Sequence, residues 1–238
     1  MGEQELITLI APWVSQVLAV LGTELIRKQM NERLDDKHRK ELEQYSSLFC
    51  GMSAFLNRKY SDAAKYFDAI NGTFPLWQIN YTMALGLSRA CEDCIVDDLK
   101  VVYSKKATSL YSKLLHNKAV PDSLTPELLI LKGRSMKVML FAQKQVNKQR
   151  QSYRKHIELI IEILLEGLQE ARQNNDVKWI QEAQYQLGCV YAMVDNESEV
   201  QYYVDELGPD SEYGEKLIRR IKERYNPQMK LREQLRDN

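Results

Sequence analysis

The chain has 238 residues, and its 33 Lys and Arg balance 33 Asp and Glu, so its formal net charge at pH 7 is zero. This balance gives the molecule as a whole no electrostatic preference for nucleic acid or for basic partners. Only ten Gly and six Pro argue for long helices and against a β-sandwich or barrel. Four Cys in a chain of this length are expected to be reduced thiols, which predicts a cytoplasmic or nuclear protein.

The first predicted helix, near residues 3–29, is strongly apolar. Residues 6–23 carry no charge, and their apolar stripe has a spacing of four residues: Leu9, Trp13, Val17 and Leu21. We expect this helix, within the segment 1–30, to pack on the rest of the chain, at the predicted helix 36–57, or to bind a partner. The uncharged stretch is at the lower limit of a membrane span and contains several polar residues, so a membrane-anchored adaptor is the less favoured alternative.

A hairpin signature follows in residues 51–75, which link the predicted helices 36–57 and 60–71. Their sequence is GMSAFLNRKYSDAAKYFDAINGTFP, and its key positions are Gly51, Tyr60, Ala63, Phe67 and Pro75. A glycine lets two helices pass closely, and a proline ends one helix and begins the next. The segment resembles one tetratricopeptide repeat, although Ser47 and Ala54 stand where that motif has a tryptophan and a tyrosine.

Further helices are predicted near 75–92, 95–117, 126–148, 151–174, 176–194, 197–207 and 210–225, with a polar tail at 226–238. Residues 185–191, YQLGCVY, repeat the leucine, glycine and tyrosine spacing of the first helix of the motif. Gly188 lies 137 residues after Gly51, which is close to four periods of about 34 residues. The resemblance therefore implies an all-α, tetratricopeptide-like (TPR-like) stack of antiparallel helical hairpins, with about ten helices and irregular repeats.

The implied stack also carries a functional expectation. Hairpins of this kind cannot bury their apolar faces alone and must stack on neighbours, so we expect one domain over residues 1–225. The resemblance implies a non-enzymatic scaffold or adaptor, acting as a subunit of a larger complex and holding a segment of a partner protein in the groove of the stack. No sequence motif identifies the partner protein.

The predicted helix 151–174 has the clearest core pattern. Its apolar residues follow the i, i+3, i+4, i+7 spacing of one helix face. The predicted buried stripe consists of Ile157, Ile160, Ile161, Leu164, Leu165 and Leu168. Full burial of each such side chain stabilises a fold by roughly 1.5–3 kcal/mol, so we expect this helix to be structural.

The residue types that carry chemistry do not occur in catalytic or metal-binding patterns. Cys91 and Cys94 form the one CxxC pair of the sequence, which supplies at most two of the four ligands of a structural zinc. The sequence has no Gly-rich phosphate loop, no GxSxG and no HExxH. We therefore expect no catalytic residue, no metal and no cofactor.

Charge is unevenly distributed along this neutral chain. No acid lies between Glu127 and Glu158, where Lys and Arg accumulate, whereas residues 195–215 hold eight acids and no base. A solvated face is the ordinary interpretation of such a basic run, and an acidic peptide or a nucleic acid is the functional one. The partner-binding residues that we predict in the run are Lys137, Lys144, Lys148, Arg150, Arg154 and Lys155. Nucleic-acid binding by residues 132–155 is the alternative to a protein partner, and few aromatic residues support it.

Overall fold

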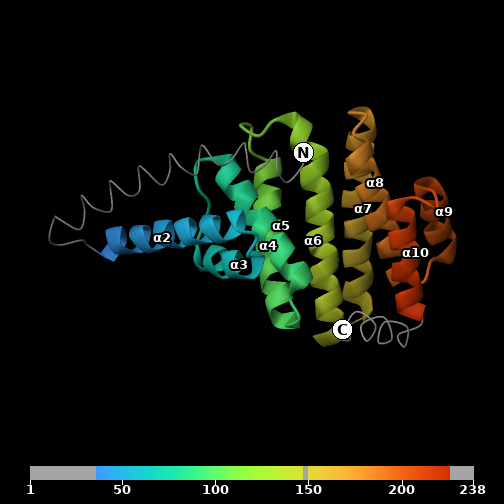
Figure 1. Cartoon of the computed structure of the whole chain (residues 1–238), viewed down its shortest axis with the longest axis horizontal. Coiled ribbons are helices and arrows are strands. Elements are labelled where there is room, and N and C mark those ends of the chain that lie inside the picture. The colour runs from blue at the N-terminus through green and yellow to red at the C-terminus, as the bar shows by residue number, and fades with distance from the viewer. Residues whose placement is uncertain (1–35, 147–149, 226–238) are drawn as a thin grey trace. The chain divides into compact units, whose positions relative to one another are not determined.

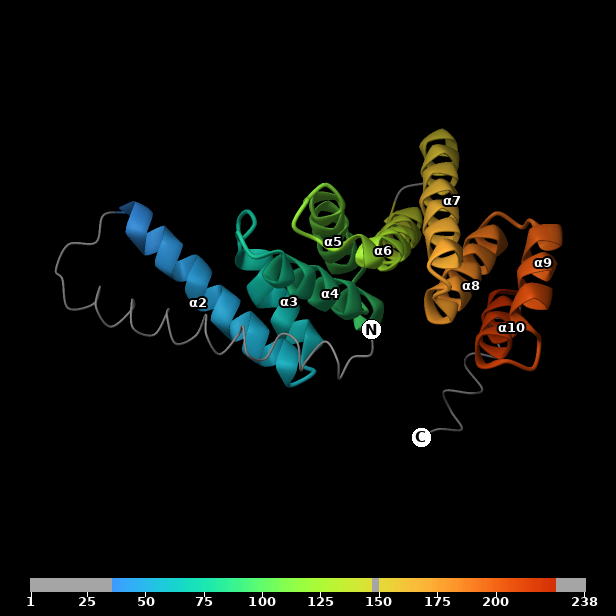
Figure 2. The same ribbon diagram turned by 90° about the horizontal axis from the view of Figure 1, so that it is seen from above.

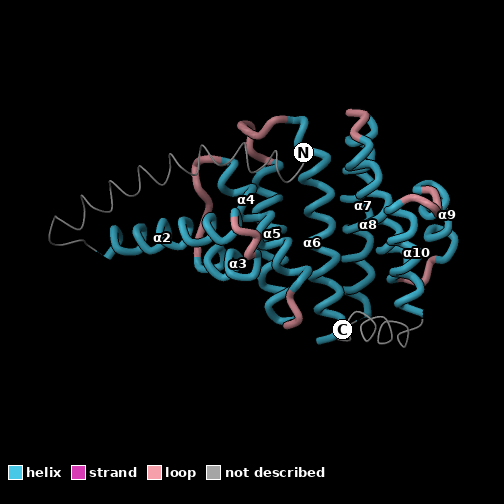
Figure 3. The backbone as a smooth tube through the Cα atoms, in the orientation of Figure 1, coloured by secondary structure: helices cyan, strands magenta, loops and turns pink. Residues whose placement is uncertain are grey.

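The computed structural model describes residues 36–146 and 150–225 (Figure 1). These residues form nine α-helices and one 3-10 turn, and they contain no strand (Figure 3). The prediction of an all-α fold is therefore confirmed for this part of the chain. The predicted helix 3–29 and the tail 226–238 lie outside the described residues.

The chain divides into two compact units, residues 1–119 (unit 1) and 120–238 (unit 2). Unit 1 contains α2 (Asp36–Leu56), α3 (Tyr60–Ala69), α4 (Trp77–Asp93) and α5 (Asp97–Leu115). Unit 2 contains η1 (Asp122–Leu124), α6 (Thr125–Val146), α7 (Arg150–Gln173), α8 (Val177–Met193), α9 (Glu197–Leu207) and α10 (Glu212–Tyr225). The predictions of a single domain over residues 1–225 and of a TPR-like stack of hairpins both depend on how the two units are joined. Both stay predictions.

Each of these nine helices begins and ends within two residues of its predicted bounds, and local capping chemistry explains this agreement at the starts of α8 and α9 and at the end of α9. The side chain of Asp176 accepts a hydrogen bond from the backbone N of Trp179 at 3.3 Å at the start of α8. Asn196 does the same for the backbone N of Glu199 at 3.4 Å at the start of α9. Gly208, with φ of 79°, follows the last residue of α9. Such groups satisfy backbone donors and allow the left-handed turn that a helix end requires.

Within each unit, helices pack on their neighbours in the sequence and also on the helix after next (Figure 1, Figure 2). In unit 1, α2 contacts α3 and α4, and α5 contacts α4 and α3. In unit 2, α8 contacts α7 and α9, and it also contacts α6 and α10. The helices α6, α8 and α10, which are separated in the sequence, are thereby brought together around α8.

The core of unit 1 is built around the ring of Phe67, which is fully buried. Gly51 of α2 and Gly86 of α4 lie against opposite edges of this ring. A Cβ at Gly51 would collide with the ring, and a Cβ at Gly86 would lie 2.8 Å from its Cε2 atom. As the sequence predicted, Gly51 is therefore a position where two helices pass too closely for a side chain.

The helices of unit 2 also approach one another at glycines. A Cβ at Gly133 of α6 would lie 2.7 Å from Cδ2 of Leu164, and a Cβ at Gly167 of α7 would lie 2.8 Å from Cγ1 of Ile130. The two glycines belong to facing helices. A glycine of α6 therefore accommodates a bulky side chain of α7, and a glycine of α7 accommodates a bulky side chain of α6. At Gly188 of α8 the bulky neighbour is Leu217 of α10.

One core prediction for α7 is wrong in part. Leu165 is 43% exposed, and Ile161 is only half-buried. The buried side chains instead follow two adjacent lines, because α7 packs on both α6 and α8. They are Ile157, Ile160, Ile163, Leu164, Leu168 and Ala171. A helix between two neighbours buries a wider arc than a single stripe, and the centre of that arc lies away from Leu165.

Candidate functional site

Only some of the predicted partner-binding residues belong to the part of the chain that the structure describes. Leu9, Trp13, Val17, Leu21 and Lys148 lie outside the described residues. Lys144 belongs to α6 and Arg150 begins α7, but their side chains are also outside the described part. Arg154 and Lys155 are exposed near the start of α7. Lys137 is half-buried on α6, and its surroundings define the candidate site.

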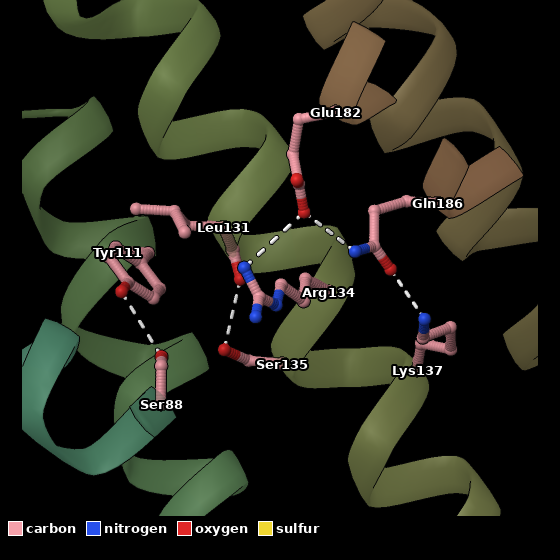
Figure 4. A network of polar contacts seen from close by, with 8 residues as sticks. All are labelled: Ser88, Tyr111, Leu131, Arg134, Ser135, Lys137, Glu182 and Gln186. Carbon is pink, nitrogen blue, oxygen red and sulfur yellow. Dashed lines mark hydrogen bonds and ion pairs between the residues drawn. The ribbon is translucent and has the colours of Figure 1, made fainter. Parts of the chain in front are cut away.

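Lys137 belongs to a polar network that joins α6 to α8 (Figure 4). Its ammonium group donates a hydrogen bond to Oε1 of Gln186. The Nε2 atom of Gln186 donates to Oε1 of Glu182 at 2.7 Å. Arg134, one turn before Lys137, places Nη1 at 3.3 Å from the same Glu182 oxygen. Two cations of α6 are therefore held in place by one carboxylate and one amide of α8.

Glu182 is the electrostatic centre of this network. Its side chain is only 10% exposed, and burial by itself would raise the pKa of its carboxyl group. The positive charge of Arg134, the hydrogen bond from Gln186 and the charges of Lys137 and Lys216 together outweigh burial and lower that pKa. Glu182 is therefore ionised at neutral pH.

An aromatic pair lies beside this network, with a second lysine over it. Lys216 of α10 has its ammonium nitrogen 5.1 Å from the ring centre of Tyr185 and 5.7 Å from that of Tyr213. The ammonium nitrogen of Lys137 lies 5.9 Å from the Tyr185 ring centre. The two tyrosine rings are themselves 5.9 Å apart. Lysines of α6 and α10 are thus both within cation–π distance of one tyrosine of α8.

The tyrosines of this pair are not poised to ionise. Burial, reinforced by the neighbouring Cys189, raises the pKa of Tyr185. Burial and the negative charge of Glu182 raise the pKa of Tyr213 to about 12. Both side chains therefore act as neutral aromatic and hydrogen-bonding groups at physiological pH. We call the whole set the α6–α8–α10 surface, and its residues are Arg134, Lys137, Glu182, Tyr185, Gln186, Tyr213 and Lys216.

Sequence reasoning identified one residue of this surface as partner-binding, Lys137, and missed its neighbours. The sequence pattern places Tyr185 in the repeat motif, and Lys216 follows directly on the acidic run 195–215. The basic run was defined along the chain, whereas the surface is assembled across three helices that are separate in the sequence. The signal available was the spacing of Glu182, Tyr185 and Gln186, which places three polar side chains on one face of α8, where the fold buries them.

The CxxC cysteines show no shared ligand geometry. Cys91 is buried, and its Sγ donates to the backbone oxygen of Ser88 at 3.0 Å. Cys94 has its Sγ 3.5 Å from the backbone oxygen of Val96. Ser88 in turn exchanges a hydrogen bond of 3.1 Å with the hydroxyl of Tyr111 (Figure 4). Across residues 36–146 and 150–225, no group of three or more His, Cys, Asp or Glu is arranged to hold a metal ion.

The sequence also left a membrane-anchored adaptor as the less favoured alternative. Among the helices that the structure describes, none combines the length and apolar character that a membrane span requires. The uncharged residues 6–23, on which that alternative rests, are outside this set.

Comparison with known proteins gives no match to a family model, to a curated protein or to a solved structure. The resemblance of residues 51–75 to a tetratricopeptide repeat therefore stays an expectation from the sequence.

Proposed function

We propose that the protein is a non-enzymatic scaffold or adaptor of the cytosol or nucleus that binds a partner protein as a subunit of a larger complex. The observation that carries this proposal is the α6–α8–α10 surface, where charged and aromatic side chains of three helices meet. A face assembled from helices of neighbouring repeats is the way in which helical-repeat proteins present a binding surface.

Two further features support this proposal. The packing of Gly51 and Gly86 against Phe67 is the kind of contact expected of a repeat hairpin, and it favours the TPR-like interpretation. Phe141 lies one turn after Lys137 on α6 and is 50% exposed. Residues four apart share a helix face, so Phe141 adds an apolar group on the same side of α6 as Lys137. Aromatic residues are enriched in protein interfaces.

Site-specific photo-crosslinking tests the proposal. A photoreactive phenylalanine analogue at Phe141 of the full-length protein should crosslink to one defined protein in cells. The same analogue at Tyr202 of α9 is the matched control, because that side chain is 48% exposed but belongs to another surface. The protein identified should in turn co-purify the unmodified chain. Absence of any specific crosslink at Phe141, or the same products from both positions, would contradict the proposal.

The second candidate function is nucleic-acid binding by residues 132–155. The observation in its favour is the exposure of Arg154 and Lys155 near the start of α7. Phosphate contacts give an affinity that falls steeply with salt. If this function is the correct one, the double variant R154E/K155E should lose affinity for a single-stranded oligonucleotide, and the salt dependence of binding should become shallower.

A further inference from the structure

We propose that the exposed apolar face at the start of α5 docks on the same face of a second copy of this chain, with the two α5 helices antiparallel across a two-fold axis. This inference goes beyond the proposed function, because it assigns a homodimer contact to unit 1 and does not involve the α6–α8–α10 surface. Exposed apolar side chains carry it, together with charges that complement themselves under two-fold symmetry.

Four apolar side chains that are close in the sequence are exposed at this end of unit 1. Ile95 and Val96, between α4 and α5, are 93% and 49% exposed. Leu99 and Val102, in the first two turns of α5, are 41% and 43% exposed. Within unit 1, α5 packs on α4 and α3, and its buried side chains lie on another arc of the helix. Exposed apolar side chains that gather in one place mark an interaction site, whereas scattered ones need no explanation.

Charge changes sign along this face. Residues 92–98 contain four acids and no base, whereas residues 99–120 contain five lysines and no acid. Within this set, Lys100 pairs with Asp97 at 3.3 Å. The order of the charges also suits the dipole of α5, which favours acids at its start and bases towards its end. The dipole does not explain why apolar side chains are exposed between the acids and the bases.

Asp98 and Lys105 are the opposite charges on either side of Val102. The spacing i, i+4, i+7 places all three side chains on one face of α5, and all three are exposed. Neither Asp98 nor Lys105 has an ion-pair partner among residues 36–146 and 150–225. The two do not pair with each other, because seven residues span about 10 Å along a helix, and side chains of one helix pair at a spacing of three or four. Both charges are therefore available to another molecule.

A second copy of the chain supplies the complementary face. When two α5 helices lie antiparallel with a two-fold axis beside Val102, Asp98 of each copy faces Lys105 of the other. The exposed leucines and valines of both copies meet between these charge pairs. A parallel pair would instead place Asp98 against Asp98, so the charges select the antiparallel arrangement. Four side chains per copy form a smaller interface than the roughly 800 Å² per partner of stable complexes, so we expect a dimer that dissociates at micromolar concentrations.

Sedimentation velocity of the full-length protein between about 1 and about 500 µM tests the proposal. The average mass should rise from the 27.8 kDa of one chain towards twice that value. L99S should weaken self-association by about tenfold or more, because each dimer loses two leucines. L159S on α7 is the matched control, since Leu159 is 44% exposed and Leu99 is 41% exposed. A chain that stays monomeric over this range, or equal losses in the two variants, would overturn the inference.

A charge exchange then tests the antiparallel register. D98K and K105E should each weaken the dimer by about fivefold or more, because each places like charges opposite one another twice. The double variant D98K/K105E exchanges the two charges and should restore self-association to within about threefold of wild type. Single variants without effect, or a double variant as weak as the single ones, would refute the pairing. Circular dichroism of each variant verifies that the helices remain folded.

Discussion

The contact of Gly51 with Phe67 allows a quantitative test of the core of unit 1. In the variant Gly51→Ala, the new methyl group would lie 2.6 Å from Cδ1 of Phe67, well inside van der Waals contact. The ring cannot retreat freely, because Gly86 of α4 bounds its opposite edge and the side chain is fully buried. We expect G51A to destabilise the packing of α2, α3 and α4.

The expected magnitude follows from two opposing effects. Overpacking of a dense core by one methyl group costs about 1–3 kcal/mol. Alanine is a better helix former than glycine by up to about 1 kcal/mol. Because the overlap is severe and the ring is confined, we expect the upper part of the packing range, about 2–3 kcal/mol, and hence a net destabilisation of about 1–2 kcal/mol. Ser46, an exposed residue of the same helix, provides the control, because the difference between S46A and S46G measures the helix-propensity gain without a packing change.

Phe67→Leu removes the ring edge that the new methyl group meets. The cost of G51A should therefore be smaller in the F67L background, with a coupling energy of at least about 1 kcal/mol in the double-mutant cycle. Hydrogen exchange of α3 peptides, followed by mass spectrometry in the full chain, reports the local opening free energy. Peptides of α8, in unit 2, serve as the internal reference. A neutral G51A, or effects that add without coupling, would refute the packing argument.

Three further substitutions test other contacts. Glu182→Gln should lower the opening free energy of α8 by about 1–3 kcal/mol at pH 7, because it removes a buried charge partner. The pKa of Glu182 is lowered in the folded protein, so its contribution to stability is present above the ordinary pKa of 4.5 and is lost as the pH falls through the folded pKa. The stabilities of wild type and E182Q should therefore converge in acid, and hydrogen exchange at pH 7 and at acidic pH can verify this. Asp176→Ala should destabilise the start of α8 by about 1 kcal/mol through loss of its cap, measured by urea unfolding. Lys106→Met should destabilise the C-terminal end of α3 by about 1–2 kcal/mol, visible as faster exchange there, because Lys106 donates to two backbone oxygens at that end.

The starts of α8 and α9 and the end of α9 were predictable because they depend on local chemistry. Asp176 and Asn196 cap the helices that follow them, and Gly208 follows the last residue of α9. These signals act over three or four residues, so they can be found in a sequence without knowledge of the fold. The Gly51–Phe67 contact was also predictable, since the spacing of small and bulky residues in a hairpin reflects one local packing geometry.

Burial across several helices was less predictable. The apolar pattern of α7 indicated one buried stripe, yet Leu165 is exposed while Ile163 is buried. Periodicity gives the apolar arc of a helix but not the number or the direction of its neighbours. That information depends on tertiary packing, here the contacts of α7 with both α6 and α8.

The candidate site shows why a basic run in a sequence and a basic surface in a fold are different things. Arg154 and Lys155 follow Lys137 in the same run, yet they are exposed on α7, whereas Lys137 is in contact with α8. The second lysine of the site, Lys216, comes from α10 and follows the most acidic stretch of the chain. Charge density along the sequence counts charged residues that are neighbours within one helix. A charged surface of the fold depends instead on residues that several helices bring together. The buried carboxylate of Glu182 determines where that convergence occurs, because it orients cations that would otherwise repel one another. The candidate site could therefore be assembled only once the fold placed this buried acid between cations of α6 and α10.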